Sequence, residues 1–403
     1  MGEKPNITVI VLDTLRLDTF NRLSAQKGRE LSMLGNFVTF QGCIAPSPWT
    51  LPSHASLFTG MYPSEHGAHE TKSVKALDIA KISLKKRTFV SELKAMRYRT
   101  FAISANPYVH PVYGFTEFDS FTEESYFTDI WGSVVEISDR LKPRVAKYRN
   151  EYGSDILRLS AAMLKEDPNL LFESALSGLA LTPLAAVKKL KARLIDGWPI
   201  EKGGKNTVRR VQGMAMKRPF FLFINLMEAH DPYTVSKKNA MSWVTPFLKE
   251  KTSVATLELW KRLYWKAAQR GYAYAFSIIE GLIERFGDNQ IIILTSDHGQ
   301  EFGEHGFIGH GTVLDDEVIR VPLAVLLPKG LSRKKQRRYS SLVNIRKFVL
   351  AAAKGDENAI DELYSSEVHA ESFGVPAAIS KVKGIDERKL KAHEKVTKRR
   401  FRS

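Results

Sequence analysis

Four short apolar runs, each followed by polar residues, constrain the fold of this chain more than any other feature. The first run, Asn6–Leu12, is apolar and largely β-branched, and Asp13 follows it. The other runs and the polar residues that follow them are Thr100–Ser104 with Asn106, Phe220–Leu226 with His230, and Gln290–Thr295 with Asp297 and His298. Continuous apolar runs of this length are typical of strands buried on both faces of a parallel sheet. Val321–Leu327 is a fifth expected strand.

Helical patterns lie between these runs. One covers Phe89–Met96, and another covers Tyr264–Phe286, which places most of its apolar residues on one stripe. Alternating strands and helices predict an α/β fold, a three-layer αβα sandwich with a large, mostly parallel sheet. Ligands of such sheets bind beyond the carboxyl ends of the strands, where the polar residues named above are found.

The region from about residue 121 to 217 interrupts this alternation. It is helical in pattern and rich in Lys and Leu, with an apolar segment at 170–184 followed by a basic one at 187–193. We expect a helical insertion that covers the mouth of the site, although such a segment is also typical of helices on an anionic membrane surface. The sequence thus predicts one catalytic domain over residues 1–375, which carries the insertion, and a basic tail over 376–403.

Composition bounds the class of protein. With 403 residues, 43% of them hydrophobic, the chain can bury a large core. No run is long and apolar enough for a membrane span or a signal peptide, and a single cysteine excludes an intrachain disulfide, so we expect a cytoplasmic protein. The formal net charge of +16 predicts attraction to anions, and the basic runs at 333–338 and 395–402 are either solvated surface or binding sites.

The segment 46–60 places a hydroxyl group in an unusual local setting. Three prolines predict an irregular loop from Pro46 to Pro52, and a helix is expected to begin just after it. Thr50 would then lie in front of a helix N-terminus, where a hydroxyl is well placed to attack an anionic centre. The alternative is a proline-rich loop that only connects two elements.

Asp297 and His298 form the core of a predicted metal site. A carboxylate beside an imidazole at a strand end can bind Zn²⁺, or Mn²⁺ in a more oxygen-rich site. Asp13 offers a third ligand, and Thr50 could complete the site through its hydroxyl, whose pKa a bound cation would lower. Each aspartate alone could instead serve as a helix cap. Several histidines lie in the same loops, namely His54, His230, His298, His305 and His310. They could donate to a substrate oxygen or protonate a leaving group.

These segments resemble the sulfatase family of the alkaline phosphatase superfamily. Val9–Thr14 resembles the first metal-binding strand, Thr50–Gly60 the nucleophile signature, and Leu226–Tyr233 the segment with a substrate-binding histidine. Thr295–Gly299, followed by His310–Gly311 and Arg320–Pro322, resembles the later metal-binding and closing motifs. Five ordered motifs over roughly three hundred residues are highly specific for the superfamily.

The departures from the family pattern bear on the substrate. Sulfatases of the usual kind oxidise a Cys or Ser to formylglycine, which Thr50 cannot form, and Cys43 lacks the flanking residues and is expected to be buried. His54 replaces the motif arginine, Thr14 replaces the second aspartate of the first strand, and His298 replaces an asparagine of calcium-dependent members. These changes favour Zn²⁺ or Mn²⁺ over Ca²⁺.

The resemblance implies a metal-dependent hydrolase that cleaves phosphate mono- or diesters or sulfate esters, with phosphate preferred. Asp13, Thr50, Asp297 and His298 would hold one divalent ion, although Glu228, His230, His305 and His310 could supply a second. Thr50, His310 and His230 would be catalytic, with His310 as the acid; His54, Asn106, His230 and His310 would bind substrate.

The alternatives are an arylsulfatase-like sulfuric ester hydrolase, a phospho-group transferase, or a non-catalytic binder of acidic glycans or lipid headgroups. We expect an anionic ester substrate, with polysaccharide-linked and lipid-linked esters both open. We expect no nucleic acid partner. Peripheral contact with an anionic membrane stays an alternative.

Overall fold

The computed structural model describes residues 3–26, 29–70, 79–124, 156–169, 199–233, 241, 245–248, 252–329, 331, 339–375, 379, 384–397 and 401–402. The chain divides into two compact units, one of Met1–Glu124 with Pro199–Ser403 and one of Ser125–Trp198. In the second unit the described element is helix α8 (Ile156–Glu166). The larger unit contains the predicted site.

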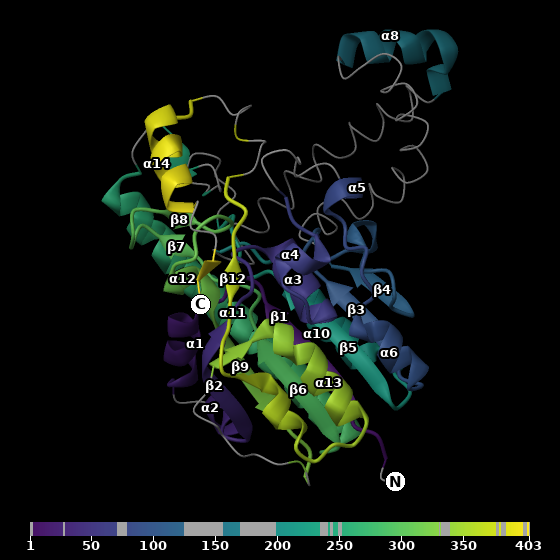
Figure 1. The fold of residues 1–403 in the computed structure, drawn as a ribbon. Helices are drawn as coiled ribbons and strands as arrows, with labels where there is room; N and C mark the ends of the chain where they lie inside the picture. Colours follow the sequence, from purple (N-terminus) through teal and green to yellow (C-terminus); the bar gives the residue numbers. More distant parts are fainter. Residues whose placement is uncertain are drawn as a thin grey trace. The chain divides into compact units, whose positions relative to one another are not determined.

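A nine-stranded sheet forms the centre of the larger unit (Figure 1). Its strands are β1 (Asn6–Leu12), β2 (Phe37–Ile44), β3 (Arg99–Ser104), β4 (Ser120–Glu123), β5 (Phe220–Leu226), β6 (Gln290–Thr295), β9 (Arg320–Leu326), β10 (Tyr339–Ser341) and β11 (Tyr364–Ser365). The order is β11-β10-β2-β9-β6-β1-β5-β3-β4. Strands β6, β1, β5, β3 and β4 are parallel, whereas β9 runs antiparallel to both β6 and β2. The predicted α/β fold with a large, mostly parallel sheet is confirmed.

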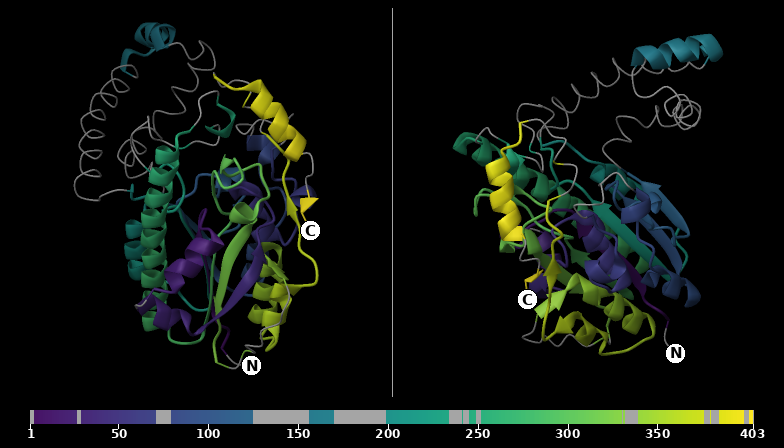
Figure 2. Two further views of the ribbon diagram at one scale, coloured as in Figure 1. Left: turned by 90° about the vertical axis from the view of Figure 1, so that its left-hand side faces the viewer. Right: turned by 45° about the horizontal axis from the view of Figure 1, so that its top comes forward.

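Helices cover both faces of this sheet. The α-helices described in the larger unit are α1 (Leu17–Ser24), α2 (Arg29–Leu34), α3 (Thr50–Thr59), α4 (Pro63–His66), α5 (Ile79–Ile82), α6 (Phe89–Ala95), α10 (Gly204–Gly213), α11 (Val254–Phe286), α12 (Asp316–Ile319), α13 (Ile345–Ala353) and α14 (Glu387–Thr397). Two short antiparallel pairs of strands lie outside this sheet, β7 (Glu301–Phe302) with β8 (Ile308–Gly309) and β12 (Ala370–Glu371) with β13 (Phe401–Arg402). Figure 2 shows the long helix α11 running along the sheet.

Alternate residues of β1 explain the three layers. Ile7, Val9 and Val11 belong to one apolar cluster, which contains residues of α3, α6 and α13. Ile10 and Leu12 belong to a second cluster, which contains residues of α1, α10 and α11. Because side chains alternate across a strand, a run that is buried on both faces must be apolar at every position.

Helix α3 begins three residues earlier than the sequence suggested. Thr50 is its first residue, so the predicted loop ends at Trp49 and the hydroxyl lies within the first helical turn. Pro52 fits there because the first turn has N–H groups without intrahelical partners. All ten side chains of α3 are buried, and Gly60 ends the helix with a left-handed φ of 68°.

Part of the expected insertion lies outside the described residues, including its apolar and basic segments at 170–193. Within the range 121–217, β4 belongs to the central sheet and α10 packs against α11, both in the larger unit. The basic run at 333–338 is likewise outside the described residues. Cys43 is buried and unpaired, as expected. Among the described residues, no helix has both the length and the hydrophobicity needed to cross a membrane.

Candidate active site

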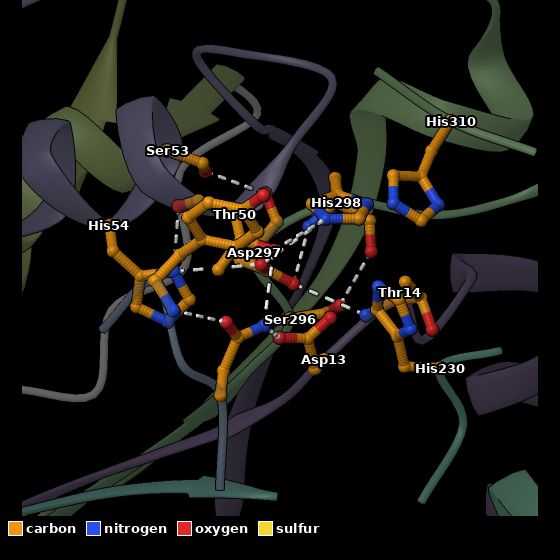
Figure 3. A network of polar contacts seen from close by, with 12 residues as sticks. Asp13, Thr14, Thr50, Ser53, His54, His230, Ser296, Asp297, His298 and His310 are labelled. Carbon is orange, nitrogen blue, oxygen red and sulfur yellow. Dashed lines mark hydrogen bonds and ion pairs between the residues drawn. The ribbon is translucent and has the colours of Figure 1, made fainter. Parts of the chain in front are cut away.

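The carboxyl ends of the parallel strands bring the predicted residues together (Figure 3). Asp13 directly follows β1, Asn106 lies two residues after the end of β3, and Asp297 lies two residues after the end of β6, with His298 next to it. Asp13, Asp297 and His298 each offer one ligand atom, and these three atoms lie within 4.8 Å of one another. All three side chains are buried. The strand ends therefore bring these three predicted ligands close together.

Among the described residues, one carboxylate oxygen of Asp297 accepts hydrogen bonds and the other accepts none. Its Oδ1 accepts from the backbone N–H of His298 at 2.9 Å and from that of Thr14 at 3.2 Å. Thr14 can donate there because its backbone is left-handed, with φ at 59°, which is uncommon for a threonine. Asp297 Oδ2 accepts no hydrogen bond, although it lies 3.3 Å from His298 Nε2.

Asp13 shows the same division. Its Oδ2 accepts from the side-chain amides of Asn106 at 2.7 Å and Asn225 at 3.2 Å, whereas Oδ1 accepts no hydrogen bond. Burial and the nearby charge of Asp13 raise the pKa of Asp297 well above its usual value. Burial also opposes ionisation of Asp13, but His230, His298 and His54 outweigh it and lower the pKa of Asp13. Two buried carboxylates, each with one oxygen that no described residue donates to, suit a divalent cation.

His298 presents one ring nitrogen to this cluster. Its Nδ1 donates to the carbonyl oxygen of Gly299 at 2.9 Å, which fixes the tautomer of the neutral ring with a lone pair on Nε2. Burial lowers the pKa of His298 to about 4, so the imidazole is neutral at pH 7. A neutral imidazole that is oriented by a backbone carbonyl is the usual form of a metal-binding histidine.

Thr50 lies directly against the cluster. Its Oγ1 is 3.3 Å from His298 Nε2 and accepts from the side-chain amide of Asn106, also at 3.3 Å. Asn106 uses its other amide hydrogen for Asp13 and accepts from the backbone N–H of Tyr108 at 2.8 Å. A single side chain thus connects the hydroxyl with one of the carboxylates.

His54 is fully buried one helical turn after Thr50. Its Nδ1 donates to the carbonyl oxygen of Thr50 at 2.9 Å, and its Nε2 lies 3.4 Å from the amide of Asn225. The ring also packs edge-on against Phe223. Burial lowers the pKa of His54, so it is a neutral ring that braces the start of α3.

His230 and His310 form an adjoining group with Asp231, and these three also offer ligand atoms within 4.8 Å of one another. The ring centroids of His310 and His298 are 4.5 Å apart, and those of His310 and His230 are 4.9 Å apart. His310 Nδ1 donates to Gln300 Oε1 at 2.6 Å, and His230 Nδ1 donates to the carbonyl oxygen of Asp231 at 2.5 Å. Each ring keeps Nε2 for another partner. Burial, together with the neighbouring imidazoles, lowers the pKa of His310 well below its usual value.

Sequence reasoning missed three residues of this environment. Asn225 is the one polar residue inside the apolar run of β5, which was a usable signal. Gln300 directly follows the predicted metal motif. Lys202 gave no signal; it is buried, it donates to the backbone carbonyls of Glu228 and His230, and burial lowers its pKa to about 8. His305, in contrast, lies in a separate group with Glu301 and Glu317.

Comparison with known proteins agrees with this arrangement. Residues 202–355 match the family model described as Sulfatase. The chain is 20% identical over 365 residues to an uncharacterized sulfatase, YidJ, of Escherichia coli (strain K12), which covers 82% of this chain and 64% of that protein. The chain therefore spans slightly less than two thirds of the length of that curated relative.

Two solved structures show the same fold. One is a phosphonate monoester hydrolase of Agrobacterium radiobacter, with a TM-score of 0.58, 13% identity, and coverage of 92% of this chain and 80% of that one. The other is the C-terminal periplasmic domain of EcEptC from Escherichia coli in complex with Zn, with a TM-score of 0.55, 10% identity, and coverage of 96% and 93%. The similarity to sulfatases thus covers residues 202–355 in the family model, and the two solved structures show that this chain shares their fold.

Proposed function

We propose that this protein hydrolyses anionic esters, with phosphate mono- or diesters preferred, through Thr50 as the nucleophile. The observation that carries the proposal is the position of the Thr50 hydroxyl, 3.3 Å from His298 Nε2 at the edge of a buried Asp13–Asp297–His298 cluster. A threonine hydroxyl is a weak nucleophile unless a neighbouring group or an ion activates it. This site provides the ligands for such an ion.

A divalent cation fits the residues that are present. Asp13 Oδ1 and Asp297 Oδ2 are buried acceptors without a hydrogen bond, and His298 Nε2 carries a lone pair beside them. When bound there with Thr50, such an ion lowers the pKa of the hydroxyl and neutralises charge on the reacting group. The imidazole ligand favours Zn²⁺ or Mn²⁺ over Ca²⁺, and the similar EcEptC domain was solved in complex with Zn.

The protein residues then divide the work of the reaction. Asn106 orients the Thr50 hydroxyl, and the free N–H groups of the first turn of α3 favour an anion in front of it. Thr50 loses its hydroxyl proton to solvent, and its Oγ1 bonds to phosphorus as the ester P–O bond breaks, while a protonated His310 gives its Nε2 proton to the leaving oxygen. Water then breaks the bond between Thr50 and phosphorus and restores the hydroxyl. His310 is neutral in the free protein, so an anionic substrate must raise its pKa for this role.

His230 and His54 have different surroundings. His230 is partly exposed and keeps its Nε2 available, which suits contact with a substrate oxygen. His54 was predicted to contact substrate, but both of its ring nitrogens are near protein partners and its side chain has no exposed area. We therefore assign His54 a positioning role at the start of α3. Asn106 was also predicted to contact substrate, but its side-chain amide donates to the hydroxyl of Thr50. We therefore assign it a positioning role as well.

One tight ion is the simpler assignment. A second ion at His230, Asp231 and His310 would compete with the substrate for the Nε2 atoms of both histidines. The two histidines can instead bind the non-bridging oxygens of an anion, and the positive net charge of the chain would attract that anion.

Phosphate is preferred because threonine cannot be oxidised to formylglycine. Sulfate ester hydrolysis is the second candidate, since the family model that matches is that of the sulfatases. A transferase would use the same covalent intermediate and resolve it with an alcohol. A non-catalytic binder of acidic glycans or lipid headgroups would need neither the ion nor the hydroxyl.

Two measurements separate these candidates. Turnover of 4-nitrophenyl phosphate, bis(4-nitrophenyl) phosphate and 4-nitrophenyl sulfate is compared for the same purified protein. Hydrolysis of only the sulfate would refute the preference for phosphate. Thr50→Ala should abolish turnover while the metal content stays near that of the wild type, and Thr50→Ser is the matched control that keeps a hydroxyl. A pure binder would show no turnover before or after either change.

A further inference from the structure

We propose that Glu301, His305 and Glu317 form a second binding site for a divalent transition-metal ion, separate from the candidate active site. Glu301 lies on β7, His305 lies in the turn between β7 and β8, and Glu317 lies on α12. One ligand atom from each side chain lies within 4.8 Å of the other two. None of these residues belongs to the group formed by Asp13, Asp297 and His298.

The geometry of the three side chains is convergent. His305 Nε2 lies 2.9 Å from Glu317 Oε2 and 3.9 Å from Glu301 Oε1. The two segments that carry the acids are joined by backbone hydrogen bonds, from Gln300 N–H to the Glu317 carbonyl at 2.9 Å and from Gly299 N–H to the Val318 carbonyl at 2.7 Å. The backbone segments that carry the two acids are therefore held side by side by the fold, independently of the contacts with His305.

Glu301 supplies the independent evidence for a ligand. Its side chain has no exposed area, and no described residue donates a hydrogen bond to either of its carboxylate oxygens. The nearby Arg16 is committed elsewhere, because it donates to Asp18, to Glu304 and to the carbonyl of Gln300. A buried carboxylate without a partner is strongly unfavourable, and a bound cation would remove that penalty.

The donor set indicates the class of ion. Two carboxylates with one imidazole suit Zn²⁺ or Mn²⁺ better than Mg²⁺ or Ca²⁺, which prefer oxygen ligands alone. The side chain of His305 is 51% exposed and that of Glu317 is 23% exposed, so an ion can enter from solvent and keep water as a further ligand.

The site would stabilise the loop that carries part of the candidate active site. Gln300 directly precedes Glu301 and accepts the hydrogen bond from His310. An ion on Glu301 would restrain the backbone next to Gln300 and, through it, the orientation of the His310 ring. Its role would be structural, with no contact to the reacting atoms.

A proton is the competing explanation. Burial, followed by a side-chain hydrogen bond with Glu304 and by the charges of Glu304, Asp315 and Glu317, raises the pKa of Glu301 to about 8, so a neutral acid that donates to Glu304 could occupy the position without an ion. The two explanations differ in the number of ions bound and in how stability responds to zinc.

Zinc binding is measured by equilibrium dialysis and elemental analysis on the full chain. Wild-type protein, Glu301→Gln and His305→Gln are compared, with the exposed Glu367→Gln as the matched control. We expect each of the first two variants to bind one Zn²⁺ ion per chain fewer than the wild type, and Glu367→Gln to match it. An Asp297→Asn background, which weakens the candidate active site, should retain one ion that Glu301→Gln then removes.

Thermal unfolding provides a second readout that does not require activity. Without metal, Glu301→Gln should melt at the same or a higher temperature than the wild type, since it removes a buried acid. With Zn²⁺ in excess, the wild type should gain a larger upward shift in Tm than Glu301→Gln. Equal zinc stoichiometry and equal zinc-induced shifts in wild type and Glu301→Gln would overturn the proposal and favour a protonated Glu301.

Discussion

Asn106 and Asn225 offer a matched pair of perturbations at the candidate site. Both side-chain amides donate to the same atom, Asp13 Oδ2, at 2.7 and 3.2 Å. Only Asn106 also donates to the hydroxyl of Thr50. Asn106→Ala therefore removes a contact to the nucleophile that Asn225→Ala leaves in place, while both variants remove one donor to the predicted metal ligand.

The magnitudes follow from these contacts. A hydrogen bond to a charged group contributes about 1.5–3 kcal/mol, and loss of a residue that orients a metal ligand typically costs about 10- to 100-fold in metal affinity. Both variants should thus need more Zn²⁺ or Mn²⁺ for half-maximal activity. The contact to the neutral hydroxyl contributes about 0.5–1.5 kcal/mol, which corresponds to about 2- to 12-fold in rate. At saturating metal, Asn106→Ala should have a kcat lower than that of Asn225→Ala by this factor.

The assay is the hydrolysis rate of a nitrophenyl phosphate ester, measured as a function of metal concentration for the wild type and both variants. Thermal unfolding of each variant with bound ion excludes a folding defect as the cause. If both variants show the wild-type kcat at saturating metal, the contact between Asn106 and Thr50 has no part in the reaction. If neither changes the metal requirement, Asp13 is not a metal ligand.

Other predictions concern the ion, the support of α3 and the response to pH. Chelation should abolish turnover and lower the Tm, and Zn²⁺ or Mn²⁺ should restore both; a chelated protein with full activity would contradict the metal assignment. Ser53→Ala removes the buried hydrogen bond to the Asp297 carbonyl at 2.6 Å and should lower the free energy of unfolding by about 1–2 kcal/mol in denaturant titrations. Burial lowers the pKa of His66 to about 3, so below pH 6.5 the unfolded chain binds a proton that the folded chain does not. Stability should therefore fall by up to about 1.4 kcal/mol per unit as the pH drops from 6.5 towards 3, and less steeply in His66→Gln; parallel curves would refute this cause.

The sheet could be predicted because burial on both faces leaves a direct mark on the sequence. β1, β3, β5 and β6 were located from apolar runs, and each predicted start lies within one residue of the observed one. β2 was missed because its register shifts between Phe40 and Cys43, and the inserted polar residues break the apolar run. The antiparallel direction of β9 has no such mark, because a strand buried on both faces looks the same in either direction.

Residues of the candidate site could be predicted from the sequence where they closely follow a strand. Residues that reach the site through tertiary packing could not. Asp13, Asp297 and His298 follow β1 and β6, which are neighbours in the sheet, so proximity follows from the topology. Lys202 lies in the loop before α10 and donates to the carbonyls of Glu228 and His230. No local sequence pattern predicts these contacts. His54 illustrates a further limit, since the sequence alone could not show that its ring faces the carbonyl of Thr50 and the interior.

The central claim is that the hydroxyl of Thr50 forms a covalent bond to the substrate's phosphorus, and the most direct test is to trap that species. Wild-type protein loaded with Zn²⁺ is mixed with bis(4-nitrophenyl) phosphate, quenched in acid within the first turnover, digested and analysed by peptide mass spectrometry. We predict a 4-nitrophenylphosphoryl adduct, formed with loss of one nitrophenolate, on the peptide that contains residue 50; it is located at Thr50 and absent from Thr50→Ala. An adduct on another residue of the active enzyme would contradict this claim. Hydrolysis of the ester by Thr50→Ala at the wild-type rate would contradict it as well.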